Sequence, residues 1–122
     1  MLQIVFNKIS AAEVSAIPTL EQLDLLGEFQ VTEVMLQNLD DERFGKIERD
    51  GKVLYRYIAK DYRIYFEVID KKVVVHRILH ANTFNDFLFR TQLSSTAGED
   101  DCLKESKHFW KLIDEGKNSS PS

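Results

Sequence analysis

The hydrophobic positions of this 122-residue chain change their spacing along its length. Residues 2–6 alternate loosely between apolar and polar side chains, which is typical of a strand. Ser10 and Glu13 have the spacing of a capping box, so a short helix is expected to begin at Ser10 and to end near Pro18. Over residues 19–40 apolar side chains recur at roughly helical intervals, which predicts one long or kinked helix. These side chains are Leu20, Leu23, Leu26, Val31, Val34, Met35 and Leu39.

The next part of the chain has the pattern of β-strands. Four short segments are rich in β-branched and aromatic side chains and are separated by turn sequences. Asp50-Gly51 is the strongest turn, because glycine accepts the positive φ that a tight hairpin needs. Connections this short permit only antiparallel neighbours. We therefore expect an antiparallel meander, with the N-terminal strand able to join one edge. The predicted strands are 44–48, 53–59, 62–69 and 73–79.

Two more helices are predicted after the sheet. Asn82 or Thr83 can cap the first, and its apolar side is formed by Phe84, Phe87 and Leu88. Residues 94–101 form a polar linker, and residues 102–116 an amphipathic helix. The apolar side of that helix carries Phe109, Trp110, Leu112 and Ile113. Residues 117–122 are expected to be a disordered tail.

These elements predict an α+β fold. Two N-terminal helices pack on a mainly antiparallel sheet of four to five strands, and an extra C-terminal helix follows. With 43% hydrophobic residues the chain can build the core of one domain. It contains no apolar run long enough for a membrane span and no signal-peptide pattern, so no membrane association is expected. Cys102 is the only cysteine, and no metal-ligand spacing occurs, so we expect a cytoplasmic protein with neither metal nor cofactor.

Charge is distributed unevenly along the chain. The formal net charge is −4, but residues 42–80 contain ten Lys/Arg and six Asp/Glu. The rest of the chain is strongly acidic. Proteins that bind nucleic acid tightly usually present a broadly basic surface, because phosphate neutralisation drives their association. The pattern argues against strong independent binding of RNA or DNA, while a small local anion site in the middle segment remains compatible with it.

The segment from Tyr55 to Ile78, YRYIAKDYRIYFEVIDKKVVVHRI, resembles the core hairpins of the RelE/ParE superfamily of toxins. The run Asp61-Tyr62-Arg63-Ile64-Tyr65 is similar to the "YR" strand of RelE-like members. Leu39 and Phe44-Gly45-Lys46 are similar to the leucine-x-glycine approach to the sheet. Arg77-Ile78-Leu79-His80 is similar to the end of the last strand in ParE-like members. The resemblance covers residues 1–93, is most specific over 55–80, and leaves the C-terminal helix without a counterpart.

This resemblance implies a toxin of a type II toxin–antitoxin system. RelE-like members cut mRNA in the ribosomal A site, and ParE-like members inhibit gyrase. In either group an antitoxin wraps the sheet and helices. A protein partner, antitoxin-like or regulatory, is therefore expected. The ribosome with its mRNA is another candidate partner, and a homodimer is a further expectation.

RelE-type cleavage needs no metal but requires cations and proton-transfer groups. By the resemblance, Arg63 matches the phosphate-contacting arginine and Arg56 a basic position on the preceding strand. Both are expected on an exposed sheet surface that no helix covers, although either could instead pair with Glu67 or Asp61. His80 is a candidate acid or base at the strand end. Further binding residues are expected at Lys60, Asn82 and Thr83.

Several positions depart from the family pattern. Leu54 stands where RelE carries a lysine, Thr83 where its second catalytic arginine falls, and Phe89 where its tyrosine falls. A phenylalanine cannot transfer a proton. Period-2 alternation places His76 on the same side of the last strand as His80, either in the core or as a replacement acid or base. On this count much of the usual catalytic set is missing.

Three functions are therefore open. The first is a toxin-like protein with weakened or lost nuclease chemistry that binds a protein, ribosome or RNA-processing partner. The second is a working metal-independent, ribosome-dependent endoribonuclease that uses Arg56, Arg63 and His80. The third is a ParE-like topoisomerase inhibitor. The C-terminal helix is expected either to cover its own domain or to mediate self-association.

Overall fold

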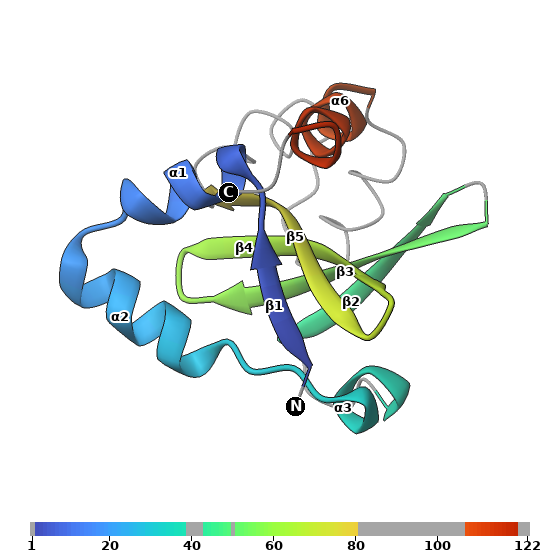
Figure 1. The fold of residues 1–122 in the computed structure, drawn as a ribbon, viewed down its shortest axis with the longest axis horizontal. Helices are drawn as coiled ribbons and strands as arrows, with labels where there is room; N and C mark the ends of the chain where they lie inside the picture. Colours follow the sequence, from blue (N-terminus) through green and yellow to red (C-terminus); the bar gives the residue numbers. More distant parts are fainter. Residues whose placement is uncertain (1, 39–42, 50, 81–106, 120–122) are drawn as a thin grey trace, which may run out of the picture.

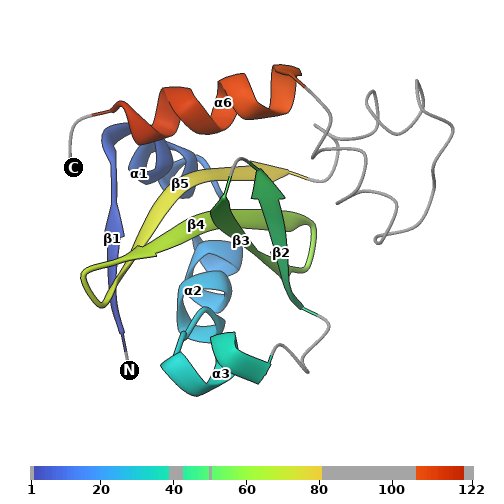
Figure 2. The same cartoon turned by 90° about the vertical axis from the view of Figure 1, so that its right-hand side faces the viewer.

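The computed structural model describes residues 2–38, 43–49, 51–80 and 107–119. It is an α+β protein with one five-stranded mixed sheet and helices on both faces (Figures 1 and 2), so the α+β part of the expected fold is confirmed. The strands are β1 (Gln3–Phe6), β2 (Phe44–Arg49), β3 (Lys52–Ala59), β4 (Tyr62–Ile69) and β5 (Lys72–His80). The described helices are α1 (Lys8–Ser15), α2 (Thr19–Glu28), α3 (Glu33–Asn38) and α6 (Lys107–Lys117).

The sheet has the strand order β1-β5-β4-β3-β2. β2 to β5 form the predicted antiparallel meander, and their bounds differ from the predicted ones by at most one residue. β1 joins the edge beside β5 and runs parallel to it, from Gln3 opposite Lys72 to Phe6 opposite Val75. The β4–β5 turn has positive φ at both Asp70 (52°) and Lys71 (62°), as the tightest hairpin turns require.

The cap of α1 differs from the predicted one. Asn7 is the N-cap: its side chain accepts a hydrogen bond from the Ser10 backbone N–H at 2.7 Å, and the Ser10 hydroxyl accepts from the Asn7 N–H at 3.0 Å. The capping box is therefore Asn7 with Ser10, and the predicted box of Ser10 with Glu13 was wrong. Asn7 directly follows β1 and caps α1, so it is the only residue between the two elements.

The predicted helix over 19–40 is divided into α2 and α3, and its apolar stripe faces outward. Leu20, Leu23 and Val34 are 78%, 63% and 63% exposed. Val31 is the exception in this stripe, because it is buried together with Phe29 between the two helices. The Val31 carbonyl accepts from the Leu2 N–H at 3.0 Å, so this segment leaves helical conformation to extend along the sheet. The segment that carries the buried Phe29 and Val31 therefore interrupts the single helix that the spacing predicted.

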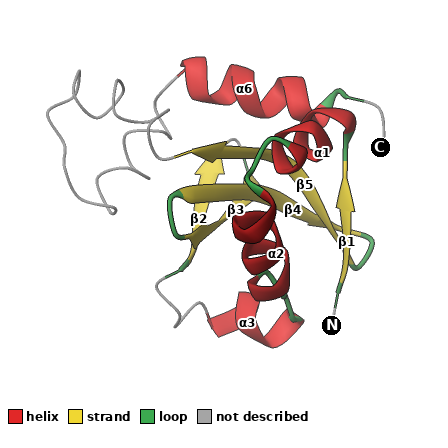
Figure 3. Ribbon diagram, turned by 90° about the vertical axis from the view of Figure 1, so that its left-hand side faces the viewer, coloured by secondary structure: helices red, strands yellow, loops and turns green. Residues whose placement is uncertain are grey.

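The first core lies between the sheet and helices α1 and α2 (Figure 3). Its centre is aromatic: the Phe29 ring lies 5.3 Å from Tyr57 and 5.5 Å from Phe66. β4 and β5 contribute the fully buried Ile64, Phe66, Val73 and Val75. Tyrosines of β3 and β4 also contribute to packing. Tyr57 on this face and Tyr65 on the other are buried.

A second core covers the opposite face of the sheet, beneath α6 (Figure 2). Phe109 and Ile113 of α6 are buried against residues of all four antiparallel strands, namely Ile47, Leu54, Tyr65 and Leu79. Burying a phenylalanine or isoleucine side chain stabilises by about 1.5–3 kcal/mol each. Trp110 and Leu112 pack at the margin of this core. The helix therefore docks on its own domain, which is one of the two expected arrangements.

Parts of the predicted C-terminal organisation lie outside the described residues. These are the helix beginning at Asn82 or Thr83, the linker 94–101 and residues 102–106 of the last helix. Lys117 is the last residue of α6 rather than the first residue of a tail. Within the part of the chain that the structure describes, no helix is both long and apolar enough to cross a lipid bilayer.

Candidate functional site

Arg56 and Arg63 lie on the same face of the sheet, the face on which α6 docks. Arg56 is opposite Tyr65, and Arg63 is two residues before Tyr65 on β4, so the two arginines are diagonal neighbours. Side chains in such positions are about 7–8 Å apart at the backbone, within reach of one shared anionic ligand. The register of the β3–β4 hairpin thus brings together two of the three residues expected to carry chemistry.

The expected exposure of Arg56 was wrong, because this side chain is only 5% exposed. Its Nη1 donates to the carbonyl oxygen of Arg43 at 3.1 Å. Gly45, directly opposite on β2, leaves the space for the guanidinium, since a Cβ at this position would overlap it. Arg63 is half-buried, and its Nη1 donates to the Lys60 carbonyl at 3.4 Å. The predicted helix-free surface does not exist here, because α6 covers part of this face.

His80 lies on the other face of the sheet. It pairs with Tyr62 across β4 and β5, and the two rings meet edge to face at 5.1 Å. Tyr62 packs against the first core, whereas Leu79, opposite Arg63, belongs to the second. The three predicted catalytic residues are therefore not assembled in one site. Lys60 contacts α2, because its Nζ is 3.2 Å from a carboxylate oxygen of Asp24 in that helix.

A β-bulge separates His76 from His80. Tyr65 pairs with Arg77 and Phe66 with Val75, so His76 is an extra residue on β5. The bulge shifts the alternation, and His76 lies against Glu67 on the side of α6, opposite to the side of His80. The prediction that the two histidines share one side was therefore wrong. A sequence pattern with strict period 2 cannot reveal a bulge.

His76 is buried and lies beside the partly exposed Glu67. The imidazole is 2% exposed, and its Nε2 lies 3.2 Å from Glu67 Oε1 in a poorly aligned contact rather than a hydrogen bond. Nδ1 has no hydrogen-bond partner among the described residues. Burial lowers the pKa of His76 below its ordinary value of 6.5, and the nearby Glu67 carboxylate offsets only part of this effect. The neutral form is therefore favoured at physiological pH.

The buried histidine should make stability depend on pH. Because the His76 pKa is lowered in the folded state, the unfolded chain binds the proton more readily. The contribution of neutral His76 to the free energy of unfolding should be complete above about pH 6.5. It should be lost as the pH falls through the folded-state pKa of His76. Urea denaturation of wild type and His76→Gln, between about pH 7 and pH 5, measures this. An equally steep fall in the variant would contradict the assignment.

A cleft of about 280 Å³ lies between α6 and strands β3 and β4. Its charged lining residues are Lys52, Glu67, Asp114 and Lys117, and Trp110 forms part of the wall. Lys117 Nζ is 3.6 Å from Glu67 Oε1, so two of these charges already pair with each other. The cleft can hold small polar molecules, but Arg56 and Arg63 do not line it. It is therefore separate from the arginine pair.

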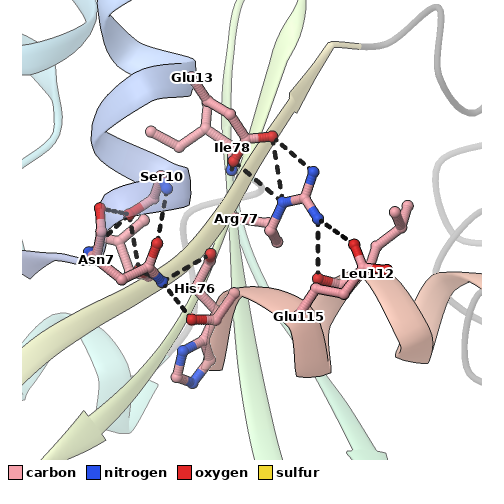
Figure 4. A network of polar contacts seen from close by, with 10 residues as sticks. Asn7, Ser10, Glu13, His76, Arg77, Ile78, Leu112 and Glu115 are labelled. Carbon is pink, nitrogen blue, oxygen red and sulfur yellow. Dashed lines mark hydrogen bonds and ion pairs between the residues drawn. The ribbon is translucent and has the colours of Figure 1, made fainter. Parts of the chain in front are cut away.

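Arg77, next to the bulge, joins α1 to α6 (Figure 4). Its guanidinium donates to both carboxylate oxygens of Glu13 at 3.0–3.2 Å, and Nη1 donates to the Leu112 carbonyl at 3.1 Å. Nη1 also lies 3.4 Å from Glu115 Oε2. Glu13 accepts the Ile78 N–H at 3.0 Å as well. Planar, two-point pairing of this kind suits arginine and fixes the helix orientation.

Asn7 makes a second link at the same place. Its Nδ2 donates to the carbonyl oxygens of Val75, His76 and Gly116 at 2.8–3.1 Å, so its two hydrogens are shared among three acceptors. Gly116 allows the C-terminal end of α6 to touch β5, because a Cβ there would overlap the His76 carbonyl. The bulge therefore serves as the attachment point for α6.

Sequence reasoning missed this attachment. The position of Asn7, directly after a strand and before a helix, was an available signal for a cap. Nothing in the sequence pairs Arg77 with Glu13, which is 64 residues away. Within the described residues no three His, Cys, Asp or Glu side chains gather as metal ligands would. A scan against protein-family models found no match, and a search of curated proteins found none either.

Proposed function

We propose that this protein is a toxin-like binding protein, similar in plan to RelE/ParE toxins, with weakened or lost nuclease chemistry. It binds a protein partner, and the docking surface is the exposed apolar side of α2 and α3. This surface, the outer stripe, consists of Leu20, Leu23, Leu26, Val34 and Met35, all of them exposed. The exposure of these large apolar side chains is the observation that carries the proposal.

The outer stripe has the form of a docking surface for a helix or an extended segment. Leu20, Leu23 and Leu26 follow at three-residue intervals, so they lie along one side of α2. Scattered exposed leucines are ordinary, whereas a row of them marks an interaction surface. Because the polar side of α2 faces the rim of the sheet through Asp24 and Glu28, the apolar side is left outward.

Charge specifies the chemistry of the partner. Residues 19–38 contain four acidic side chains and neither lysine nor arginine, and two of the four, Asp24 and Glu28, pair with Lys60 and Arg43. The partner segment should therefore combine large apolar side chains with lysine or arginine at its margins. An antitoxin-like or regulatory protein with an amphipathic, basic segment meets this description. The acidic residues are Glu21, Asp24, Glu28 and Glu33.

The placement of the predicted catalytic residues supports a weakened nuclease. Cleavage through a 2′-hydroxyl needs a proton-transfer group beside the cations. Here His80 lies on the opposite face from Arg56 and Arg63. The histidine on their own side, His76, is buried beside Glu67. Neither histidine is placed for proton transfer next to a phosphate held by the arginine pair.

One observation favours a second function, a metal-independent endoribonuclease that acts in the ribosome. The two arginines are diagonal neighbours, which is an arrangement suited to a phosphodiester. Induced expression in a bacterium separates the two functions. Growth arrest with mRNA cut at ribosomal A sites would support the nuclease. Growth without such cuts is expected for the binding protein.

The docking surface is tested by capture of partners from native cells with wild type and with Leu20→Asp/Leu23→Asp. Charges on the outer stripe should lower retention of the partner at least about tenfold, because apolar contacts near the centre of an interface dominate affinity. Ile69→Asp, at an exposed apolar position on β4, is the matched control, and Arg63→Ala tests the arginine pair.

The expected result is one protein, identified by mass spectrometry, that carries an apolar and basic segment. It should be lost with the double variant and retained with both controls. Retention by the double variant, or loss with Arg63→Ala alone, would overturn the proposed docking surface. Circular dichroism confirms that each variant is folded.

A further inference from the structure

One side of α6 forms a wall of the cleft that separates this helix from β3 and β4. Positions three or four residues apart lie on the same side of a helix, and the α6 residues of the cleft have this spacing. The wall is apolar at Trp110 and Ile113 and charged at Asp114 and Lys117. Ile113 is buried in the second core, whereas Trp110 is only partly buried. The indole ring therefore offers apolar surface to a ligand in the cleft.

The strands supply the facing wall of the cleft. Lys52 and Leu54 are two residues apart on β3, so they point to the same face of the sheet, and β4 contributes Glu67. Leu54 belongs to the second core, as Ile113 does, so the apolar parts of both walls are continuous with that core. The volume of about 280 Å³ lies just below the range of about 300–1,000 Å³ that is typical of sites for drug-sized ligands. The cleft therefore suits a ligand of the size of an amino acid.

Two of the four charges that line the cleft are already engaged. Glu67 Oε1 lies 3.2 Å from Nε2 of the buried His76 and 3.6 Å from Lys117 Nζ. The other two charged side chains, Lys52 and Asp114, are exposed and take part in no ion pair among the residues that the structure describes. They do not pair with each other either, so a ligand that carries both charges can lie between them. The cleft thus presents one open cation and one open anion.

We propose that this cleft binds a small zwitterion, namely a free α-amino acid with an apolar side chain. The ligand carboxylate pairs with Lys52, its ammonium group pairs with Asp114, and its side chain packs against Trp110. Hydrogen bonds between charged groups are about twice as strong as those between neutral groups, so two such pairs dominate recognition. A ligand with a single charge satisfies only one of the two side chains. This inference goes beyond the proposed partner binding and uses the α6 side of the sheet (Figure 2), so it does not depend on the outer stripe.

The charge requirement is tested on the wild-type full chain with three ligands that share one carbon skeleton. L-Leucine carries both charges, isocaproate lacks the ammonium group, and isoamylamine lacks the carboxylate. Trp110 is the only tryptophan and lines the cleft, so its fluorescence reports occupancy without a label. L-Leucine should bind about tenfold or more tightly than either analogue, because each analogue loses one charged pair. Calorimetry checks the same three dissociation constants without relying on fluorescence.

Two substitutions assign the charges to the side chains. Lys52→Met should remove the advantage of L-leucine over isoamylamine, because the carboxylate then has no cation to pair with. Asp114→Asn should remove the advantage of L-leucine over isocaproate, because the ammonium group then lacks its anion. Lys8→Met, at an exposed position on α1, is the matched control and should bind all three ligands as wild type does.

The comparison of ligands on the wild-type chain does not depend on whether a variant folds. L-Phenylalanine, with a larger apolar side chain, is a second amino acid probe and should also bind. The proposal is overturned if isocaproate or isoamylamine binds wild type as tightly as L-leucine does. It is equally overturned if neither amino acid shows saturable binding, or if folded Lys52→Met and Asp114→Asn keep the wild-type preferences. Failure of the outer stripe to bind a protein would not affect these results.

Discussion

Replacing Phe66 with alanine should lower the free energy of unfolding by about 3–5 kcal/mol. The Phe66 side chain is fully buried, and its ring lies 5.5 Å from both Phe29 and Tyr55. Removing it leaves a cavity at the point where the segment between α2 and α3 meets β3 and β4. Because domains of this size have a total stability of about 5–15 kcal/mol, this change alone would bring the chain close to unfolding.

Urea denaturation followed by circular dichroism measures this loss. The matched control is Val68→Ala, two residues further along β4, where the side chain is exposed. Its effect should stay within about 0.5 kcal/mol. If the two variants lost similar amounts, Phe66 would not occupy the centre of the first core. Trp110 fluorescence should change only with global unfolding of the Phe66→Ala variant.

Replacing Arg77 with methionine is the second large effect, expected at about 2–4 kcal/mol. Methionine keeps much of the apolar stem but removes the guanidinium, so the Glu13 carboxylate loses its two-point partner in a partly buried position. The Leu112 carbonyl of α6 also loses its donor. We therefore expect the loss to appear first as release of α6, seen in Trp110 fluorescence at urea concentrations that leave the sheet folded.

A double-mutant cycle isolates the pair. Glu13→Gln keeps an oxygen that can accept the Ile78 N–H while it removes the charge facing Arg77. The double variant should lose less stability than the sum of the two single variants, by about 1–3 kcal/mol. Strictly additive losses would show that Arg77 and Glu13 act independently, in conflict with their bidentate contact.

Local patterns sufficed for the sheet but not for the helices. The strands β2 to β5 are separated by short turns, and both their positions and their antiparallel order follow from that local information. The helical stripe of Leu20, Leu23 and Val34 predicted the wrong buried face. The burial of Phe29 depends on aromatic partners in β3 and β4, which the spacing within residues 19–40 cannot express.

The candidate site shows the same division. The proximity of Arg56 and Arg63 follows from hairpin register, which sequence can supply. The separation of His76 from His80 depends on one extra residue in β5, and the burial of Arg56 involves the space left by Gly45. The docking of α6 depends on Arg77 and Asn7, whose partners lie far away in the chain. Contacts over such separations cannot be obtained from periodicity.

The parallel pairing of β1 with β5 sets the order in which the chain can assemble. β1 is made before the other four strands, yet its partners, from Lys72 to Val75, emerge about seventy residues later. The hairpins from β2 to β5 close over short loops and can form early, whereas β1 must wait for the last strand. Until then the apolar N-terminal segment has no sheet to join. A nascent chain of this protein is therefore most prone to misassociation just before β5 leaves the ribosome.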